Sequence, residues 1–214
     1  MSHYFRKNLG QPARLLAGFT LIELLVSIAI LTVILTVVVT SQSTYTEGAA
    51  LSNLADEIAS TMSQAQAYGI GVREFSPGSN EFSAAYGLAF SLLNSGSNSA
   101  YIYFADRNGN KRYNNNWSCP TGAASECLGK VNITRGNFIE SLCVVRTADS
   151  DLCDVGRVDI SFARPNTEAQ IIFFDNGGVR FTPENMKGAR IILESSGGLV
   201  RSVVVFATGQ VSVQ

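Results

Sequence analysis

A single carboxylate, Glu23, lies inside a long apolar stretch near the N-terminus of this 214-residue chain. From Phe19 to Val39 it is the only charged side chain. A helix of this length, at about 1.5 Å per residue, covers the roughly 30 Å hydrocarbon core of a bilayer. Because an ionised acid is costly in lipid, such residues usually have a partner and a function. The stretch is therefore predicted to span a membrane, with Glu23 in need of a cation.

The residues before the apolar stretch indicate its orientation. Arg6, Lys7 and Arg14 precede it without any acidic residue. Basic flanks stay on the cytoplasmic side, so the larger C-terminal part is expected to cross the membrane. A secretory signal has a shorter apolar core that is followed by a small-residue cleavage site. Here the small residue, Gly18, precedes a longer core, which fits neither a secretory signal nor a plain anchor.

The segment from Gly18 to Ile30, together with its basic leader, resembles the prepilin leader of the type IV pilin and type II secretion pseudopilin superfamily. The resemblance implies that a prepilin peptidase cuts between Gly18 and Phe19 and then N-methylates Phe19. Glycine suits such a site because it lacks a side chain and leaves the backbone accessible.

The implied cut also gives Glu23 a partner. It creates an α-amino group on Phe19, and such a group is mostly protonated near neutral pH. Glu23 would then pair with the Phe19 amino group of a neighbouring subunit, which offsets the burial of both charges. The alternative is a Glu23 side chain that extends to the membrane surface without a specific partner.

The chain is expected to have three parts. Residues 1–18 form the leader, 19–70 form a helix that spans the membrane over 19–39, and 71–214 form a β-rich globular domain. After the span, apolar residues recur at helical spacing, namely Leu51, Leu54, Ala55, Ile58, Met62 and Ala65. The membrane helix is therefore expected to continue as an amphipathic helix, which packs on the β-domain and ends at Gly69 and Gly71.

Short apolar and β-branched runs follow the helix, separated by turn residues. They predict strands at 86–93, 101–105, 138–145, 155–163, 170–174, 179–182, 189–195 and 199–207. Residues 175–178 and 195–198 are hairpin signals, and the polar segment 107–126 is expected to be a loop that carries the first cysteine pair. The predicted fold class is α+β, with a long N-terminal helix packed on one continuous antiparallel sheet, as in pilins.

The four cysteines favour disulfides over a metal site. Cys119, Cys127, Cys143 and Cys153 lie in the part predicted to be exported, where an even number of cysteines indicates disulfides. Three pairings are open, and the local pairs Cys119–Cys127 and Cys143–Cys153 are favoured. No pair has the short spacing that is typical of a structural zinc site.

Enzymatic chemistry finds little support in the sequence. The only histidine, His3, lies in the predicted leader, so the processed chain has no imidazole for a catalytic triad or a metal. Asp106, Asn108 and Asn110 have the alternating oxygen donors of a calcium loop, but Trp117 stands where the closing acid would be. A turn is favoured over calcium, and no other cofactor or metal is expected.

Charge argues against a protein that is built mainly to bind nucleic acid. Loss of the three basic residues of the leader changes the formal net charge from −1 to −4. Candidate phosphate contacts are Arg180, Lys187, Arg190 and Arg201. Glu184 and Glu194 lie between them along the chain, so a mixed-charge surface is favoured.

Residues 103–110 and 201–211 are similar to the GspH/FimT group of minor pseudopilins and minor pilins, although Gln210 replaces the arginine that is usual there. The resemblance implies a structural subunit of the bacterial inner membrane that enters a type II secretion pseudopilus or a type IV pilus. Its implied partners are the prepilin peptidase, other pilins, an assembly platform protein and an ATPase. The alternatives are a DNA-binding minor pilin for transformation and a major adhesive pilin.

Overall fold

The computed structural model describes residues 18–71, 74–75, 82–122 and 125–214. The predicted leader, with His3, lies outside the described residues apart from Gly18. The chain divides into two compact units, Met1–Ser43 and Thr44–Gln214. The boundary between them falls inside one helix, α1, which runs from Leu21 to Ile70.

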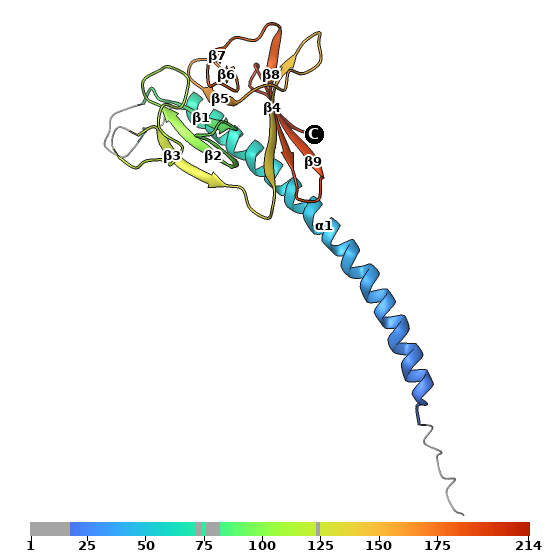
Figure 1. Cartoon of the computed structure of the whole chain (residues 1–214). Helices are drawn as coiled ribbons and strands as arrows, with labels where there is room; N and C mark the ends of the chain where they lie inside the picture. The colour runs from blue at the N-terminus through green and yellow to red at the C-terminus, as the bar shows by residue number, and fades with distance from the viewer. Residues whose placement is uncertain (1–17, 72–73, 76–81, 123–124) are drawn as a thin grey trace, which may run out of the picture. The chain divides into compact units, whose positions relative to one another are not determined.

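In the described part of the second unit, the strands form two antiparallel sheets (Figure 1). The six-stranded sheet has the order β3-β2-β1-β5-β6-β7, with β1 Ala85–Ser91, β2 Ser97–Asp106, β3 Cys127–Asn132, β5 Arg157–Phe162, β6 Ala169–Phe174 and β7 Arg180–Phe181. The four-stranded sheet has the order β10-β9-β8-β4, with β4 Phe138–Arg146, β8 Met186–Glu194, β9 Val200–Phe206 and β10 Val211–Val213.

The α+β class is confirmed, but the prediction of one continuous sheet is wrong. β4 follows β3 in the chain, yet it pairs with β8 in the other sheet. Apolar alternation indicates that a run is a strand, whereas the choice of a distant partner depends on how the whole core packs. The break between the sheets therefore has no local sequence signal.

Each of the eight predicted strands is present, with ends that shift by a few residues. Both predicted hairpins are also present, since the Gly178 N–H donates to the Asp175 carbonyl and the Gly198 N–H to the Ser195 carbonyl, each at 2.9 Å. Two strands, β3 and β10, were not predicted. Cys127 is the first residue of β3 rather than part of the preceding loop.

One face of α1 supplies the centre of the second unit's core. The predicted apolar positions are buried there, among them Leu51, Ile58 and Met62. They share one cluster with side chains of both sheets, such as Ile160 and Val203. Because each fully buried side chain of this size contributes about 1.5–3 kcal/mol, this helix face holds the two sheets together.

The end of α1 approaches β5 closely enough to require glycine. α1 ends at Ile70, and the Gly71 N–H donates to the Ala67 carbonyl at 3.0 Å. A Cβ atom on Gly69 would overlap the carbonyl oxygen of Phe162. Gly69, one of the two glycines that predicted the helix end, therefore also permits the packing of α1 on the six-stranded sheet.

Candidate functional site

The start of α1 is fixed by an N-cap. Residues 18–20 are not helical, and α1 begins at Leu21. The Thr20 Oγ1 accepts a hydrogen bond from the Glu23 N–H at 3.3 Å, and the Thr20 carbonyl accepts one from the Leu24 N–H at 3.2 Å. Thr20 is therefore the N-cap, with Glu23 at the third helical position. Sequence reasoning missed this role, although threonine three residues before glutamate is the signature of a capping box.

Glu23 lies in the first turn of α1, where the helix dipole favours a negative charge. Its side chain is exposed, and within the described residues its carboxylate forms no hydrogen bond or ion pair. The cap engages only the main-chain N–H of Glu23. The carboxylate can therefore accept a cation supplied by another molecule.

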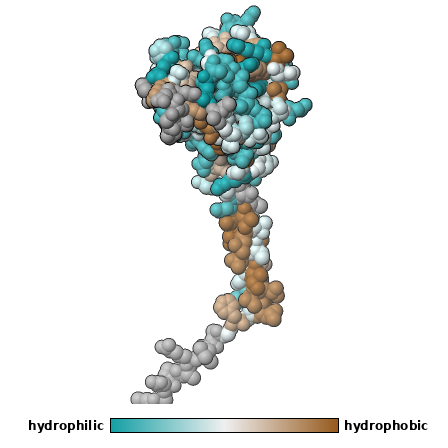
Figure 2. Space-filling view, turned by 90° about the vertical axis from the view of Figure 1, so that its left-hand side faces the viewer, coloured by the Kyte–Doolittle hydropathy of each residue, from teal (hydrophilic) through white to brown (hydrophobic). Residues whose placement is uncertain are grey.

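Leu21–Val39 is long and apolar enough to cross a membrane, with a mean hydropathy of 2.8, and Figure 2 shows it as a hydrophobic segment. Ser27, Thr32 and Thr36 each donate to a carbonyl four residues back, at 2.7–2.9 Å. These hydroxyls need no partner from lipid. Among the described residues of the span, Glu23 is thus the polar side chain that no hydrogen bond within the helix satisfies.

Residues 16–39 match the family described as the prokaryotic N-terminal methylation motif. The chain carries a methylation motif of the pilin type. The match includes Thr20, Glu23 and the apolar span, and it supports the type IV pilin or pseudopilin class. The motif implies processing by prepilin peptidase and assembly with other pilins, and it points to a membrane-anchored structural subunit rather than an enzyme. Comparison with curated proteins and with solved structures gave no match.

The cysteines are joined in the two local pairs, Cys119–Cys127 and Cys143–Cys153. The first pair ties the polar loop 107–126 to the start of β3. A small cluster that contains Tyr113 and Trp117 packs beside it. The loop is therefore anchored both by a covalent bond and by aromatic side chains.

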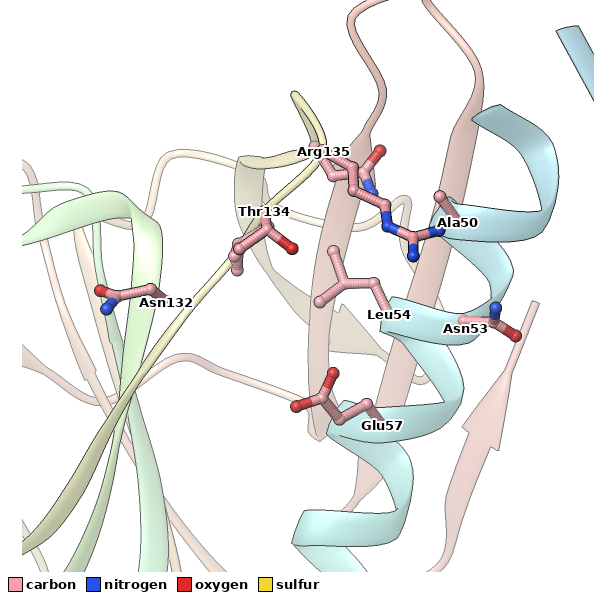
Figure 3. A pocket seen from close by; sticks show the side chains of 9 residues that line it. Ala50, Asn53, Leu54, Glu57, Asn132, Thr134 and Arg135 are labelled. Carbon is pink, nitrogen blue, oxygen red and sulfur yellow. The ribbon is translucent and has the colours of Figure 1, made fainter. Parts of the chain in front are cut away.

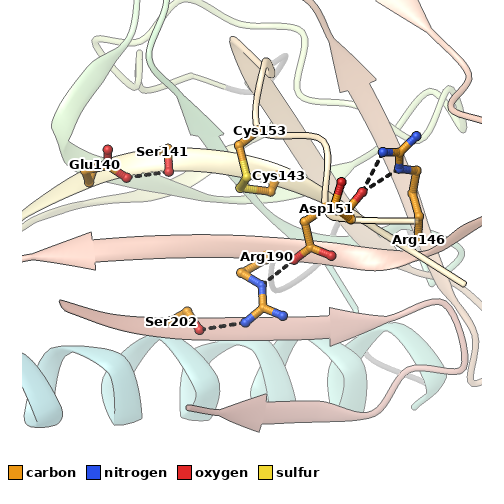
Figure 4. The surroundings of a disulfide bond; sticks show 9 residues. Glu140, Ser141, Cys143, Arg146, Asp151, Cys153, Arg190 and Ser202 are labelled. Atoms are coloured by element: carbon orange, nitrogen blue, oxygen red, sulfur yellow. Dashed lines mark hydrogen bonds and ion pairs between the residues drawn. A yellow bond between two sulfur atoms is a disulfide. The ribbon is translucent and has the colours of Figure 1, made fainter. Parts of the chain in front are cut away.

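The second disulfide lies next to a polar network on the four-stranded sheet (Figure 4). Asp151, in the loop that Cys153 closes, accepts a hydrogen bond from the Arg190 Nε at 2.7 Å. The Arg190 Nη1 also donates to the Ser202 Oγ at 3.1 Å and to the Gln214 Oε1 at 2.8 Å. Arg190, a candidate phosphate contact from the sequence, is thus engaged by groups of its own chain.

The other candidate phosphate contacts are distributed over both sheets. Arg180 lies in β7 of the six-stranded sheet, whereas Lys187 and Arg201 lie in the four-stranded sheet. The Lys187 Nζ is 5.4 Å from the centre of the Phe206 ring. The arrangement does not favour a nucleic-acid site built from these four cations.

The alternating oxygen donors at 106–110 close a turn. The Asp106 carboxylate accepts from the main-chain N–H groups of Gly109, Asn110 and Lys111, at 2.8, 3.2 and 2.7 Å. The Asn108 Oδ1 accepts from the Asn110 N–H at 3.0 Å, and the Asn110 Oδ1 accepts from the main chain of Arg112. Calcium binding stays a prediction, and this hydrogen bonding does not favour it.

A buried carboxylate that sequence reasoning missed, Glu126, also holds the loop. Its Oε1 accepts from the Asn108 Nδ2 and its Oε2 from the Asn114 N–H, each at 2.8 Å. Burial raises the pKa of Glu126, and the nearby Asp106 carboxylate adds to this effect. The loop therefore depends on a group that binds a proton more readily in the folded chain.

We expect Glu126 to make the folded state more stable as the pH falls. Because its pKa is higher in the folded chain, the folded state binds more protons, and stability is lost as the pH rises through that pKa. The free energy of unfolding of wild type minus that of Glu126→Gln should rise as the pH is lowered from 7 toward about 4.3, the ordinary pKa of glutamate. Urea unfolding of both proteins in detergent measures this difference. A difference that grows with rising pH would contradict the prediction.

Proposed function

We propose that this chain is a minor pseudopilin or minor pilin, nearest the GspH/FimT group, that is assembled into a type II secretion pseudopilus or a type IV pilus. The observation that carries the proposal is the position of the methylation motif, which covers the start of α1 and its apolar span. In the proposed topology, Leu21–Val39 crosses the bacterial inner membrane and the unit from Thr44 onward lies in the periplasm.

The proposed cut lies between Gly18 and Phe19, and Phe19 is then N-methylated. Residues 18–20 precede α1, so a peptidase can bind this main chain in an extended form without unwinding the helix. The Thr20 N-cap fixes that boundary. Among the described residues, nothing lies within 4 Å of a Cβ built on Gly18, so the fold itself does not require glycine there. Glycine at this position therefore suits recognition by the peptidase.

The freed amino group of Phe19 is the proposed partner of Glu23 from a neighbouring subunit. Both groups leave water when the apolar helices bundle, and their pairing offsets that cost. The exposed apolar side chains of the span would contact neighbouring helices in place of lipid. An assembly platform protein and an ATPase would drive extraction of the subunit from the membrane.

The composition of isolated filaments tests this proposal. Quantitative mass spectrometry of sheared, purified filaments should find the processed chain at far fewer copies than the bulk subunit. Filaments that consist mainly of this chain would favour a major adhesive pilin instead. Absence of the processed chain from every filament fraction would contradict the role of filament subunit.

A further inference from the structure

The β8–β9 hairpin lies against α1 at the end of the second unit where the helix enters it (Figure 1). A Cβ atom on Gly48 would lie 3.6 Å from the Leu199 Cδ1. A Cβ atom on Gly197, in the turn of the hairpin, would overlap the Glu47 Oε2. The turn is therefore packed on the first turns that α1 contributes to this unit.

Large apolar side chains are exposed at this end of the unit. Leu199 and Val200, which are adjacent in the chain, are 37% and 53% exposed. Tyr45 is 77% exposed and lies one helical turn before Gly48, on the side of α1 that contacts the hairpin. We call Tyr45, Leu199 and Val200 the apolar patch. Exposed apolar side chains that gather in this way mark a contact with a partner or a membrane.

The apolar patch lies close to the membrane span along the chain. Tyr45 follows Val39, the last residue of the span, by six residues. This separation is about 9 Å along a helix and at most about 20 Å in an extended chain. The headgroup layer on each side of the hydrocarbon core is about 5–7 Å thick. Because a long side chain on a helix points back toward the helix N-terminus, the Tyr45 ring is directed toward this layer, where tyrosine is enriched.

The turn that joins β3 to β4 lies next to the hairpin. A Cβ atom on Gly136 would lie 3.1 Å from the Ser196 Oγ. Figure 3 shows the Arg135 side chain directed from this turn toward α1. The two turns and the first turns of α1 in this unit therefore form one end of it.

The charged residues around the apolar patch balance one another. Glu194 pairs with Val200 across the hairpin, and Arg201 follows Val200 in β9. With Glu47 and Arg135 included, this set of described residues has two acidic and two basic side chains. It carries no excess of positive charge that would hold the patch on anionic lipid. Apolar burial is therefore the force available for a membrane contact, and it does not depend on the charge of the lipid.

We propose that the apolar patch inserts into the headgroup layer of the membrane that α1 spans and holds the second unit on the membrane surface. The span tethers the patch within reach of this membrane, so the contact needs no further association and three side chains suffice. A partner protein would first have to associate with the chain, which costs translational freedom. The inference rests on the proposed topology, in which Leu21–Val39 crosses the membrane, and not on processing at Gly18 or on a filament.

The test uses the full chain in nanodiscs of phosphatidylcholine that contain a lipid with a nitroxide on its headgroup. The NMR methyl signals of Leu199 and Val200 should be broadened, whereas that of Val179 should not. Val179 is the matched control because it is 64% exposed and directly precedes β7, away from the entry of α1 (Figure 1). Partial replacement of the phosphatidylcholine by phosphatidylglycerol should leave the broadening unchanged. Broadening that requires phosphatidylglycerol, or that is equal at Val179 and Val200, would overturn the proposal.

A second labelled lipid separates failure of this inference from failure of the topology. A nitroxide in the acyl chain should broaden the methyl signals of Val33, which lies in the span. Broadening at Val33 without any headgroup-label broadening at Leu199 and Val200 would overturn the inference alone. Absence of broadening at Val33 would overturn the proposed topology and the inference together.

A matched pair of variants separates insertion from mere proximity to the membrane. Val200→Ser removes apolar area from an exposed position, so the headgroup-label broadening of Leu199 should fall at least about threefold. Val179→Ser, the same change at the control position, should leave this broadening unchanged. Both variants should keep the thermal midpoint of wild type, because both positions are exposed. The proposal fails if Val200→Ser leaves the Leu199 signal as broad as in wild type.

Discussion

Glu23→Gln is expected to leave membrane insertion intact and to reduce incorporation of the chain into filaments by at least about tenfold. Insertion depends on the apolar span, which this change does not shorten. Incorporation depends on the proposed pair, since a neutral carboxamide leaves the Phe19 ammonium of a neighbour buried without its anion. Removal of one member of a buried ion pair costs about 3–5 kcal/mol, which is more than a hundredfold in an equilibrium constant. Quantification of the chain in membrane and sheared-filament fractions measures both effects.

Asp56→Asn provides the matched control for this experiment. It makes the same carboxylate-to-carboxamide change on α1, at an exposed position beyond the span. Its incorporation should equal that of wild type. If Glu23→Gln also assembled like wild type, the carboxylate would have no role in assembly, and the alternative of an unpaired Glu23 at the membrane surface would stand.

Arg157→Leu is expected to destabilise the second unit by about 3–5 kcal/mol. Asp159 is fully buried, and it accepts hydrogen bonds from the Arg157 Nε at 2.8 Å and the Arg157 Nη2 at 2.5 Å. The same Nη2 donates to the Tyr113 carbonyl, and the Tyr113 N–H donates to Asp159 at 3.0 Å. Loss of the guanidinium therefore leaves a buried carboxylate without its cation and frees part of the loop 107–126. Urea unfolding of the full chain in detergent measures the loss.

The double variant Arg157→Leu/Asp159→Leu distinguishes the charge effect from the loss of packing. Removal of both charges should restore much of the lost stability, because the orphaned carboxylate is then gone. Destabilisation by Arg157→Leu should also be smaller at low pH, where Asp159 takes up a proton. If the double variant were as unstable as the sum of the two single variants, the pair would not act as a coupled unit.

Elements whose signal is local were predictable from the sequence. The span Phe19–Val39 is marked by its long apolar run, and the apolar stripe of α1 repeats with helical spacing. The glycine-rich turns mark two hairpins. β3 was missed because Gly129 and Lys130 interrupt its short apolar pattern. β10 was missed because it has only three residues. The pairing of β4 with β8 depends on residues about 50 positions apart in the chain, so no short window contains it.

The residues of the candidate site also differ in whether their sequence signal is local or depends on the folded chain. Gly18, Phe19 and Glu23 were singled out from neighbours within a few residues, and their roles in cleavage, methylation and pairing stay predictions. The Thr20 cap was equally local, and its signature was overlooked. Asp159 was not predictable, since its arginine partner and Tyr113 meet only after β5 and the loop have folded together. The oxygen pattern at Asp106 favoured a turn and left calcium open, because the sequence does not show which N–H groups a carboxylate will accept from.

Mass spectrometry of the N-terminus of the chain recovered from filaments tests the central claim most directly. The account predicts a chain that begins with N-methylphenylalanine at position 19 and retains the whole apolar span. A chain that still begins at Met1, or one that is cut after the apolar span and so lacks it, would contradict the account.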